Sequence, residues 1–446
     1  MSKLVTYKLG DICNVTDYVA NGSFAALNEN VEYLDTKNYA VMIRLVDYKS
    51  NWKSSLLYTT KKSYEFLKKS SLNPGDVVIA NVGANAGTIF RVPNLGMPMT
   101  LAPNAVACFP KELNILDRDF LYYYFLSSNG QWSISTILGG SAQPKFNKTD
   151  FRSLELSVPA IDDQKAISHI LGTLDKKIEL NKKTNKSLED IAKGLFKSWF
   201  IDFDPVRAKA EGRSTGLPDE ISDLFPDSFE DSELGEIPYT WRIYSLKELS
   251  SYLSRGISPK YCEQGEGVRV VNQKCIRDGM IDFSKARNHD PLLKKIEGRE
   301  IQKFDCLINS TGVGTLGRVA VTPDIEEKSV IVDSHVTVVR GKNIEQSLFL
   351  TMLLLQRQGE IESLGEGSTG QTELSRKILG DLEIIFPSEK LINQFFISSL
   401  SLFKRKWLNE KITLKLCELK DTLLPKLISG ELRIPDAEKI ILEAGI

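Results

Sequence analysis

The chain has 446 residues, which is too long for one ordinary domain and predicts two or three. Its formal net charge of -1 gives no overall sign of a polyanion-binding protein, although local basic patches can still bind DNA. The six cysteines form no C-x-x-C pair and there are only three histidines, which argues against a disulfide framework and against a zinc site.

The N-terminal residues MSKLVTYKLGD lack the apolar region of a secretory signal, and no apolar run reaches the length of a transmembrane helix. We therefore expect a soluble, cytoplasmic protein with reduced thiols and no membrane partner.

Residues 1–159 are predicted to form a first domain of short strands and turns. The segments NYAVMIRLVDY, GDVVIANVG and TIFRVP are rich in β-branched residues and are bounded by Gly, Asn or Pro. A helix-like apolar run, DFLYYYFLSS, follows at 119–128, and the alternating strand SLELSVP closes the domain.

A long helix is predicted from about residue 160 to 207, of which we assign 160–204 to a separate helical segment. Apolar or Asn side chains recur there with the 4-3-4-3 spacing of a coiled-coil seam. Buried Asn at such a position can set the register of a helix pair. The predicted seam residues are Ile167, Leu171, Leu174, Ile178, Asn181, Asn185, Leu188, Leu195 and Trp199.

An acidic, Pro-punctuated linker is predicted at 205–237, and the pattern of the first domain then begins again at 238–388. FDCLINSTGVGTLGRVAV resembles GDVVIANVGANAGTIFRV, with Asp305 matching Asp76. STGQTELSRKILGDLEIIFP matches GSAQPKFNKTDFRSLELSVP without a gap, so that Gln371 falls on Gln143.

A second long helix is predicted at 389–430, followed by a C-terminal tail at 431–446. Its seam is expected at Leu400, Phe403, Trp407, Leu414 and Leu424. The chain is therefore a domain and a helix, twice. We expect an α+β protein in which two similar mixed α/β domains are held apart by two long helices, as a pseudo-two-fold internal repeat.

Two glycine-rich strings look catalytic but lack what their chemistry needs. Gly312-Val-Gly-Thr-Leu-Gly317 matches a dinucleotide-binding pattern, but a strand follows it where a helix N-terminus must take the pyrophosphate. GEGSTGQT at 365–372 has P-loop spacing but carries Gln371 where the phosphate-binding Lys belongs. We predict a β-hairpin turn for the first string and no nucleotide site for the second.

Polar residues of the repeated loops suit DNA recognition. Gln and Asn pair with adenine, Arg and Lys with guanine, and hydroxyls and Lys with phosphates. Each residue alone could equally be an ordinary polar loop residue, and it is the matching of two sets that favours binding. The candidates are Arg44, Lys49, Asn81, Asn85, Gln143, Lys145, Asn147 and Lys148 in the first half, and Asn272, Gln273, Lys274, Arg277, Ser310, Thr311, Gln371, Thr372 and Arg376 in the second.

The most distinctive strings of the chain are GLFKSWFIDFDPVRAKAEG (194–212), LPDEISDLFPDSFEDSELGEIPYTW (217–241) and LLPKLISGELRIPD (423–436), with support from LINSTGVGTLGRV and VDSHV. Through them the chain resembles the specificity subunits of Type I restriction-modification enzymes over essentially its whole length. The resemblance implies two target-recognition domains, each reading one half of a split DNA sequence, and two helices that pair as an antiparallel coiled coil.

The resemblance also implies the partners and the cofactors. The helices would fix the gap between the half-sites and dock two modification subunits, which carry S-adenosylmethionine and methylate adenine. Restriction subunits would add ATP-dependent translocation and cleavage with Mg. This chain itself would carry no cofactor, no metal and no catalytic residue.

Two alternatives remain open at this point. The duplicated helices could belong to a scaffold that binds only proteins. The string Asp324-Ile-Glu326-Glu-Lys328 echoes a metal-dependent nuclease signature, so a stand-alone nuclease is the second alternative, although such a string is more often a solvated charged loop.

Overall fold

The computed structural model describes residues 4–140, 142–263, 266–327, 329–365 and 373–445. The chain divides into two compact units. Unit 1 comprises Met1–Leu180 and Ile412–Ile446, and unit 2 comprises Asn181–Lys411. Each long helix therefore contributes one part to each unit.

Unit 1 contains two four-stranded sheets, and one apolar cluster is formed by residues of both, among them Val78 and Val41. In the first, the order is β2-β9-β6-β7 and every neighbouring pair is antiparallel. In the second, the order is β4-β3-β8-β5, and β3 and β8 run parallel. The strands are β1 (Val5–Lys8), β2 (Cys13–Asp17), β3 (Ala40–Ile43), β4 (Leu57–Thr59), β5 (Ser71–Leu72), β6 (Val77–Ala80), β7 (Ile89–Arg91), β8 (Met99–Leu101), β9 (Ala105–Pro110) and β10 (Glu155–Val158).

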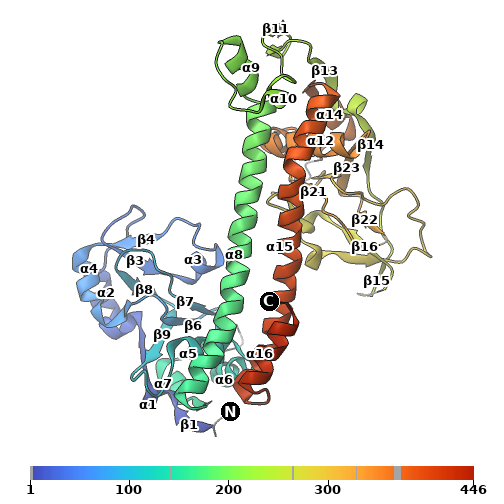
Figure 1. Cartoon of the computed structure of the whole chain (residues 1–446). Helices are drawn as coiled ribbons and strands as arrows, with labels where there is room; N and C mark the ends of the chain where they lie inside the picture. Colours follow the sequence, from blue (N-terminus) through green and yellow to red (C-terminus); the bar gives the residue numbers. More distant parts are fainter. Residues whose placement is uncertain (1–3, 141, 264–265, 328, 366–372, 446) are drawn as a thin grey trace. The chain divides into compact units, whose positions relative to one another are not determined.

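The short helices of unit 1 lie between and beside these strands (Figure 1). They are α1 (Leu9–Ile12), α2 (Phe24–Asn30), α3 (Leu45–Lys49), α4 (Lys61–Phe66), α5 (Arg118–Leu126), α6 (Ser128–Ile137) and α7 (Lys148–Arg152). The apolar run that predicted a helix at 119–128 forms α5, whose buried aromatic face includes Phe120, Tyr123 and Phe125.

Unit 2 repeats this topology, which confirms the internal repeat that the sequence predicted. The order β14-β23-β20-β21 corresponds to β2-β9-β6-β7, and the parallel pair β16-β22 corresponds to β3-β8. The two units differ in one edge strand of the second sheet. In unit 2, β15 pairs with β19 at one edge, whereas in unit 1, β5 pairs with β8 at the opposite edge. The strands are β13 (Arg242–Ser245), β14 (Ser250–Arg255), β15 (Tyr261–Cys262), β16 (Val268–Val271), β17 (Ile276–Arg277), β18 (Met280–Ile281), β19 (Arg287–His289), β20 (Cys306–Asn309), β21 (Val319–Val321), β22 (Val330–Val332), β23 (Val336–Gly341) and β24 (Glu383–Phe386).

Four helices of unit 2 follow the chain order of α1, α5, α6 and α7 in unit 1. The apolar α12 takes the place of α5, and the five-residue α14 takes the place of α7. These helices are α11 (Leu246–Leu249), α12 (Ile344–Gln356), α13 (Gln358–Ser363) and α14 (Arg376–Gly380).

The two long helices are α8 (Ile161–Phe200) and α15 (Glu389–Ser429). In each unit the corresponding parts of α8 and α15 lie side by side (Figure 1). In unit 2 the contacts run from Asn185 with Asn409 to Glu189 with Lys406, so ascending residues of one helix meet descending residues of the other. The pair is antiparallel there, as the family resemblance implied.

Most predicted seam residues of α8 are buried, whereas one predicted for α15 is wrong. Ile167, Leu171 and Leu174 are almost completely buried, but Leu414 is 64% exposed. In unit 1 the inward positions of α15 are taken instead by Leu416 and by Lys420, whose ammonium lies 2.7 Å from a carboxylate oxygen of Asp175. A heptad pattern of apolar residues does not indicate Lys420, because this position faces the partner helix through an ion pair.

The first long helix ends earlier than predicted, and the segment after it is folded. Phe203 takes a left-handed conformation (φ 57) that separates α8 from α9 (Asp204–Ala210). The acidic segment then forms α10 (Asp219–Ser222) and a hairpin of β11 (Phe229–Ser232) with β12 (Gly235–Pro238). Its Phe225 packs edge-on against Trp199, with the two ring centres 5.2 Å apart, so this segment belongs to the core of unit 2.

The segment expected as a C-terminal tail contains the amphipathic helix α16 (Ile434–Glu443). Its Ala437 is fully buried in the core of unit 1. Within the described ranges, no helix has both the length and the apolar character that crossing a bilayer requires.

Candidate nucleic-acid interface

The same two loops meet in each unit. In unit 1, an isolated bridge joins Val82, just after β6, to Lys145, just before α7. In unit 2, an isolated bridge joins Thr311, just after β20, to Glu373, just before α14. The next backbone contact is repeated as well, because Phe146 N donates to Asn81 O (3.1 Å) and Leu374 N donates to Ser310 O (2.9 Å). The polar loops that matched in the sequence therefore occupy equivalent places.

A buried carboxylate accepts a backbone hydrogen bond in the turn before β6, and a matching one does so in the turn before β20. Oδ2 of Asp76 accepts from Asn73 N at 2.8 Å, and Oδ2 of the matching Asp305 accepts from Gln302 N at 2.7 Å. Burial raises the pKa of both carboxyls, and the backbone hydrogen bond and a nearby arginine oppose that rise. These two aspartates therefore position the strands that carry the candidate loops.

Four predicted residues of unit 1 remain available to a ligand. Gln143 and Lys145 are exposed on the loop before α7. Lys49, at the end of α3, donates to Oδ1 of Asn85 on the loop after β6. The end of α3, the loop after β6 and the loop before α7 therefore lie next to one another. Their lysine, asparagine and glutamine side chains can contact both phosphates and base edges.

Four other predicted residues of unit 1 already have partners within the fold. Arg44 makes two hydrogen bonds to the buried carboxylate of Asp47, at 2.7 and 3.1 Å. Asn81 donates to Phe146 O at 3.2 Å. Asn147 caps α7, and Lys148 pairs with Asp17 at 2.7 Å. We assign these four to supporting the loops rather than to reading bases.

In unit 2, Gln273 and Thr311 come together with a residue that sequence reasoning left out. Oγ1 of Thr311 lies 2.8 Å from Nδ1 of His335 and 3.4 Å from Oε1 of Gln273. His335 is exposed and lies between β22 and β23. The signal that could have found it was the VDSHV string, which carried part of the family resemblance.

Two predictions for unit 2 are corrected by burial. Ser310 is fully buried, with its hydroxyl 2.5 Å from that of Thr337. Asn272 is also buried, and its Nδ2 donates to Lys285 O at 3.0 Å. Lys274, Arg277 and Arg376 are exposed and stay candidates, whereas Gln371 and Thr372 lie outside the described residues.

The first glycine-rich string forms a hairpin turn. It lies between β20 and β21, which pair antiparallel. Gly312 has a φ of +107, a backbone conformation that L side chains rarely adopt, so the turn itself favours glycine here. Most of the second glycine-rich string lies outside the described residues.

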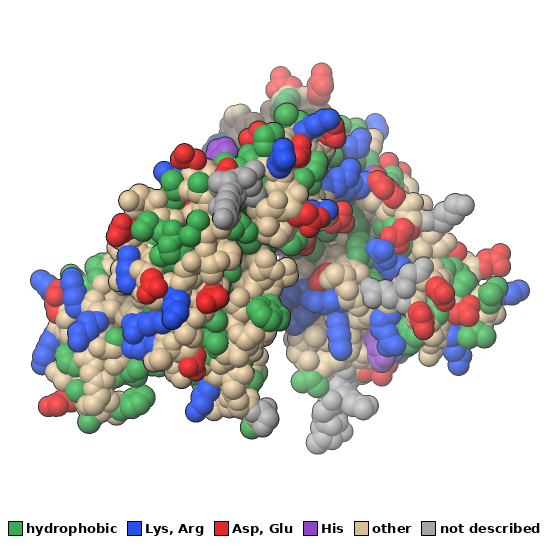
Figure 2. All heavy atoms as spheres, turned by 90° about the horizontal axis from the view of Figure 1, so that it is seen from below, with side chains coloured by type: hydrophobic (Ala, Val, Ile, Leu, Met, Phe, Trp, Pro, Cys, Tyr) green, Lys and Arg blue, Asp and Glu red, His purple; other side chains and the backbone are tan. Residues whose placement is uncertain are grey.

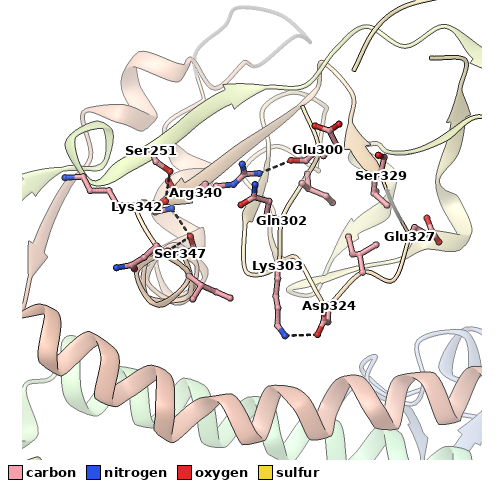
Figure 3. A pocket seen from close by; sticks show the side chains of 16 residues that line it. Ser251, Glu300, Gln302, Lys303, Asp324, Glu327, Ser329, Arg340, Lys342 and Ser347 are labelled. Carbon is pink, nitrogen blue, oxygen red and sulfur yellow. Dashed lines mark hydrogen bonds and ion pairs between the residues drawn. The ribbon is translucent and has the colours of Figure 1, made fainter. Parts of the chain in front are cut away.

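The nuclease-like string is engaged in separate ion pairs. Asp324 pairs with Lys303 at 2.7 Å, on the rim of a polar cavity of about 570 Å³, and its carboxylate points in a different direction from that of Glu327 (Figure 3). Glu326 pairs with Lys411 on α15. Lys328 lies outside the described residues, and the residues that are described contain no cluster of three acidic, His or Cys side chains suited to a metal ion. This arrangement fits a solvated charged loop.

On the face drawn in Figure 2, groups of Lys and Arg side chains alternate with Asp and Glu side chains. On this face, local groups of cations are therefore the places to look for contacts with a polyanion.

Comparison with known proteins finds similarity to one family. Residues 1–190 match the family model described as Type I restriction modification DNA specificity domain. The chain is 26% identical over 419 residues to the Type I restriction enzyme HindI specificity subunit of Haemophilus influenzae, covering 82% of this chain and 88% of that protein. It is also 26% identical over 354 residues to the MjaIX specificity subunit of Methanocaldococcus jannaschii, covering 76% of each.

The fold has a match among solved structures. The crystal structure of the Type I restriction-modification S subunit from M. genitalium superposes with a TM-score of 0.56 at 15% identity. The match covers 96% of this chain and 99% of that chain, so it extends over both units.

Proposed function

From its similarity to Type I restriction-modification specificity subunits, we propose that this chain is a member of that family and that each of its two units reads one half of a bipartite double-stranded DNA target. The chain acts as the sequence-reading, non-catalytic subunit of a cytoplasmic complex. Two modification subunits that bind S-adenosylmethionine dock along α8 and α15 and methylate adenine. Restriction subunits with ATP and Mg add translocation and cleavage.

One observation carries this proposal most strongly. The bridge between Val82 and Lys145 and the bridge between Thr311 and Glu373 bring together the same pair of loops in both units. Between them the loop pairs present amide, cationic and hydroxyl side chains, such as Gln143, Lys145 and Thr311, and these are groups that read base edges and hold phosphates. A duplicated pair of such loops suits a target with two halves.

The long helices suit the role of a spacer. With 40 and 41 residues, α8 and α15 are each roughly 60 Å long at a rise of about 1.5 Å per residue. Two readers that meet successive major grooves on one side of a duplex need a separation of about 34 Å, which is within that length.

The first test is to co-express the chain with its modification subunit and to map methylated adenines across a genome. A bipartite motif is the expected result. Electrophoretic retardation of duplex DNA by the purified complex is the companion measurement. A complex that assembles but neither retards DNA nor methylates a bipartite motif would favour the protein-binding scaffold instead.

The spacer role has its own test. One heptad inserted into both helices, after Asn181 in α8 and at the opposite level of α15, adds roughly 10 Å while preserving the phase of the seam. The gap between the half-sites should lengthen and the bases of each half-site should stay the same. A change in the bases that are read, with the gap unaltered, would contradict the spacer role.

A further inference from the structure

One charged position differs between the two units. In unit 1, β9 residue Cys108 pairs with Val15 of β2 and with Val77 of β6. In unit 2, β23 residue Val339 pairs in the same way with Leu253 of β14 and with Cys306 of β20. The residue two places further along the outer strand is therefore Asp17 in unit 1 and Arg255 in unit 2.

The partner of that residue is also at an equivalent place. Lys148 is the first residue of α7, and Arg376 is the first residue of the corresponding α14. In unit 1 the two side chains form an ion pair, with Nζ of Lys148 2.7 Å from Oδ1 of Asp17. In unit 2 both positions carry arginine, so these two side chains cannot form the ion pair that they form in unit 1.

These arginines line a cleft in unit 2. Its volume is about 560 Å³. Among the described residues that line it there is one carboxylate, that of Glu373, which pairs with Arg255 at 2.6 Å and is itself 58% exposed. The lining includes Ser254, Arg255, Arg299, Glu373, Arg376 and Lys377.

The cations of this cleft are incompletely neutralised. Arg255 donates from Nη2 to Leu374 O at 2.8 Å, but its buried Nε has no hydrogen-bond partner among the residues that the structure describes. Arg376 and Lys377 are exposed, and within the same described ranges no carboxylate forms an ion pair with either. Nη1 of Arg299 makes long contacts, 3.4 Å to Oγ of Ser254 and 3.5 Å to the hydroxyl of Tyr252.

We propose that this cleft binds a backbone phosphate of the DNA at the half-site read by unit 2, and that unit 1 lacks the equivalent contact. Several arginine and lysine groups converge on one concave site, and the planar guanidinium fork matches phosphate oxygens. The cleft also adjoins the candidate reading loops, since Glu373 is both the partner of Arg255 and the residue bridged to Thr311. A duplex whose base edges reach those loops brings its backbone close to the cleft, which favours DNA over an acidic peptide.

This inference rests on the proposed function and names a positioning contact for it. Glu373 has a specific part, because a phosphate that enters the cleft competes with this carboxylate for Arg255. Removing the carboxylate should strengthen DNA binding, whereas removing a cation should weaken it. A purely structural role for these residues does not predict opposite signs.

The test compares Arg376→Gln, Glu373→Gln and the control Lys342→Gln in the complex with the modification subunit. Lys342→Gln removes an exposed cation just after β23 in the same unit, on neither of the long helices. For Arg376→Gln we expect affinity for the cognate duplex and for a random duplex to fall by the same factor, on the order of tenfold. The slope of log Kd against log salt should fall by about one. Glu373→Gln should shift affinity in the opposite direction, and Lys342→Gln should change neither quantity.

Several results would overturn the inference. An unchanged salt slope in Arg376→Gln would mean that no phosphate is held there. Altered bases in one half-site would make Arg376 a base contact, and loss of the modification subunit from the complex would make the cleft a protein-docking site. In each case a wild-type complex that still reads a bipartite target leaves the proposed function standing. A thermal unfolding curve for each variant checks that the fold is intact.

Discussion

Nδ2 of Asn409 on α15 donates a 2.9 Å hydrogen bond to Oδ1 of Asn185 on α8. Nδ2 of Asn185 in turn donates to the backbone oxygen of Lys406 at 3.2 Å. Lys406 is almost fully buried and reaches Glu189 at 3.0 Å and Glu410 at 3.2 Å. The helix pair of unit 2 is therefore joined by polar contacts here, and such contacts form in only one register.

The first prediction concerns this asparagine pair. Asn185→Leu should destabilise unit 2 by about 1–3 kcal/mol, because it leaves Nδ2 of the buried Asn409 without its acceptor. The double change Asn185→Leu with Asn409→Leu should recover part of that loss, since both polar groups are then gone. Urea unfolding of the four members of the double-mutant cycle measures the coupling.

Asn393→Ala is the control for that cycle, because Asn393 is exposed on the same helix. It should change stability by less than about 0.5 kcal/mol. Additive losses from the two single changes would mean that Asn185 and Asn409 are not energetically coupled.

The second prediction compares the stability effects of two leucines of α15, the buried Leu416 and the exposed Leu414 that the heptad pattern placed in the seam. Leu416 is fully buried in the core of unit 1 and Leu414 is 64% exposed. Leu416→Ala should cost about 2–5 kcal/mol through lost burial and the cavity that remains. Leu414→Ala should stay within about 0.5 kcal/mol of the wild type. Equal losses in thermal unfolding would place Leu414 in the seam after all.

The third prediction concerns the buried ion pair of unit 2. Arg340 donates to both oxygens of the fully buried Asp305 carboxylate, at 2.8 and 2.6 Å. Arg340→Met leaves this carboxylate uncompensated and should cost about 3–5 kcal/mol near neutral pH. It also raises the pKa of Asp305 further above the value in the unfolded chain.

The sign of the pH dependence follows from that shift. Between the two pKa values the native state holds a proton that the unfolded state has released, so the stability of Arg340→Met falls as pH rises through this interval. The loss relative to the wild type should therefore be smaller at about pH 5 than at about pH 8, as measured by urea unfolding. Adding Asp305→Asn to Arg340→Met should remove this difference. The same loss at both pH values would contradict the role given to Asp305.

The fourth prediction distinguishes base contacts from phosphate contacts in unit 1. Gln143 and Lys145 are both exposed and lie two residues apart on the loop before α7. Gln143→Ala should relax one half-site, at a cost of about 1–3 kcal/mol in discrimination between bases. Lys145→Ala should weaken binding to all sequences alike and lower the salt slope by about one.

Selection of bound sequences from a random pool, with methylation as the second readout, measures both effects. A uniform loss for Gln143→Ala would make that residue a phosphate or structural contact. A change of preferred base for Lys145→Ala would reverse its assignment.

Several features could be predicted because they depend on local pattern. The matching segments around Asp76 and Asp305 predicted the repeat, since two similar stretches of sequence fold into similar strands and turns. The gapless match of the segments before α7 and α14 put Lys145 and Glu373 at equivalent positions, and each of them forms the equivalent bridge in its unit. The family resemblance came from strings that the chain carries in full.

Other features depended on contacts between residues far apart in the sequence. Ser310 and Asn272 looked like available loop residues, but Thr337 and the carbonyl of Lys285 already satisfy their side chains. Periodicity placed Leu414 in the seam, whereas Lys420 reaches Asp175 across the helix pair and takes an inward position. The acidic composition of 205–237 suggested a linker, and the few apolar residues within it, such as Phe225, were enough to fold it onto unit 2.

The sequence by itself therefore determined the duplication, the two long helices and the loops in which readers of DNA should be sought, because these follow from the spacing and type of neighbouring residues. The tertiary structure alone decided which polar groups of those loops remain free, and that Arg255 stands where Asp17 neutralises Lys148 in the other unit. Burial and charge compensation depend on which side chains meet across the fold, and the order of residues along the chain does not specify those meetings.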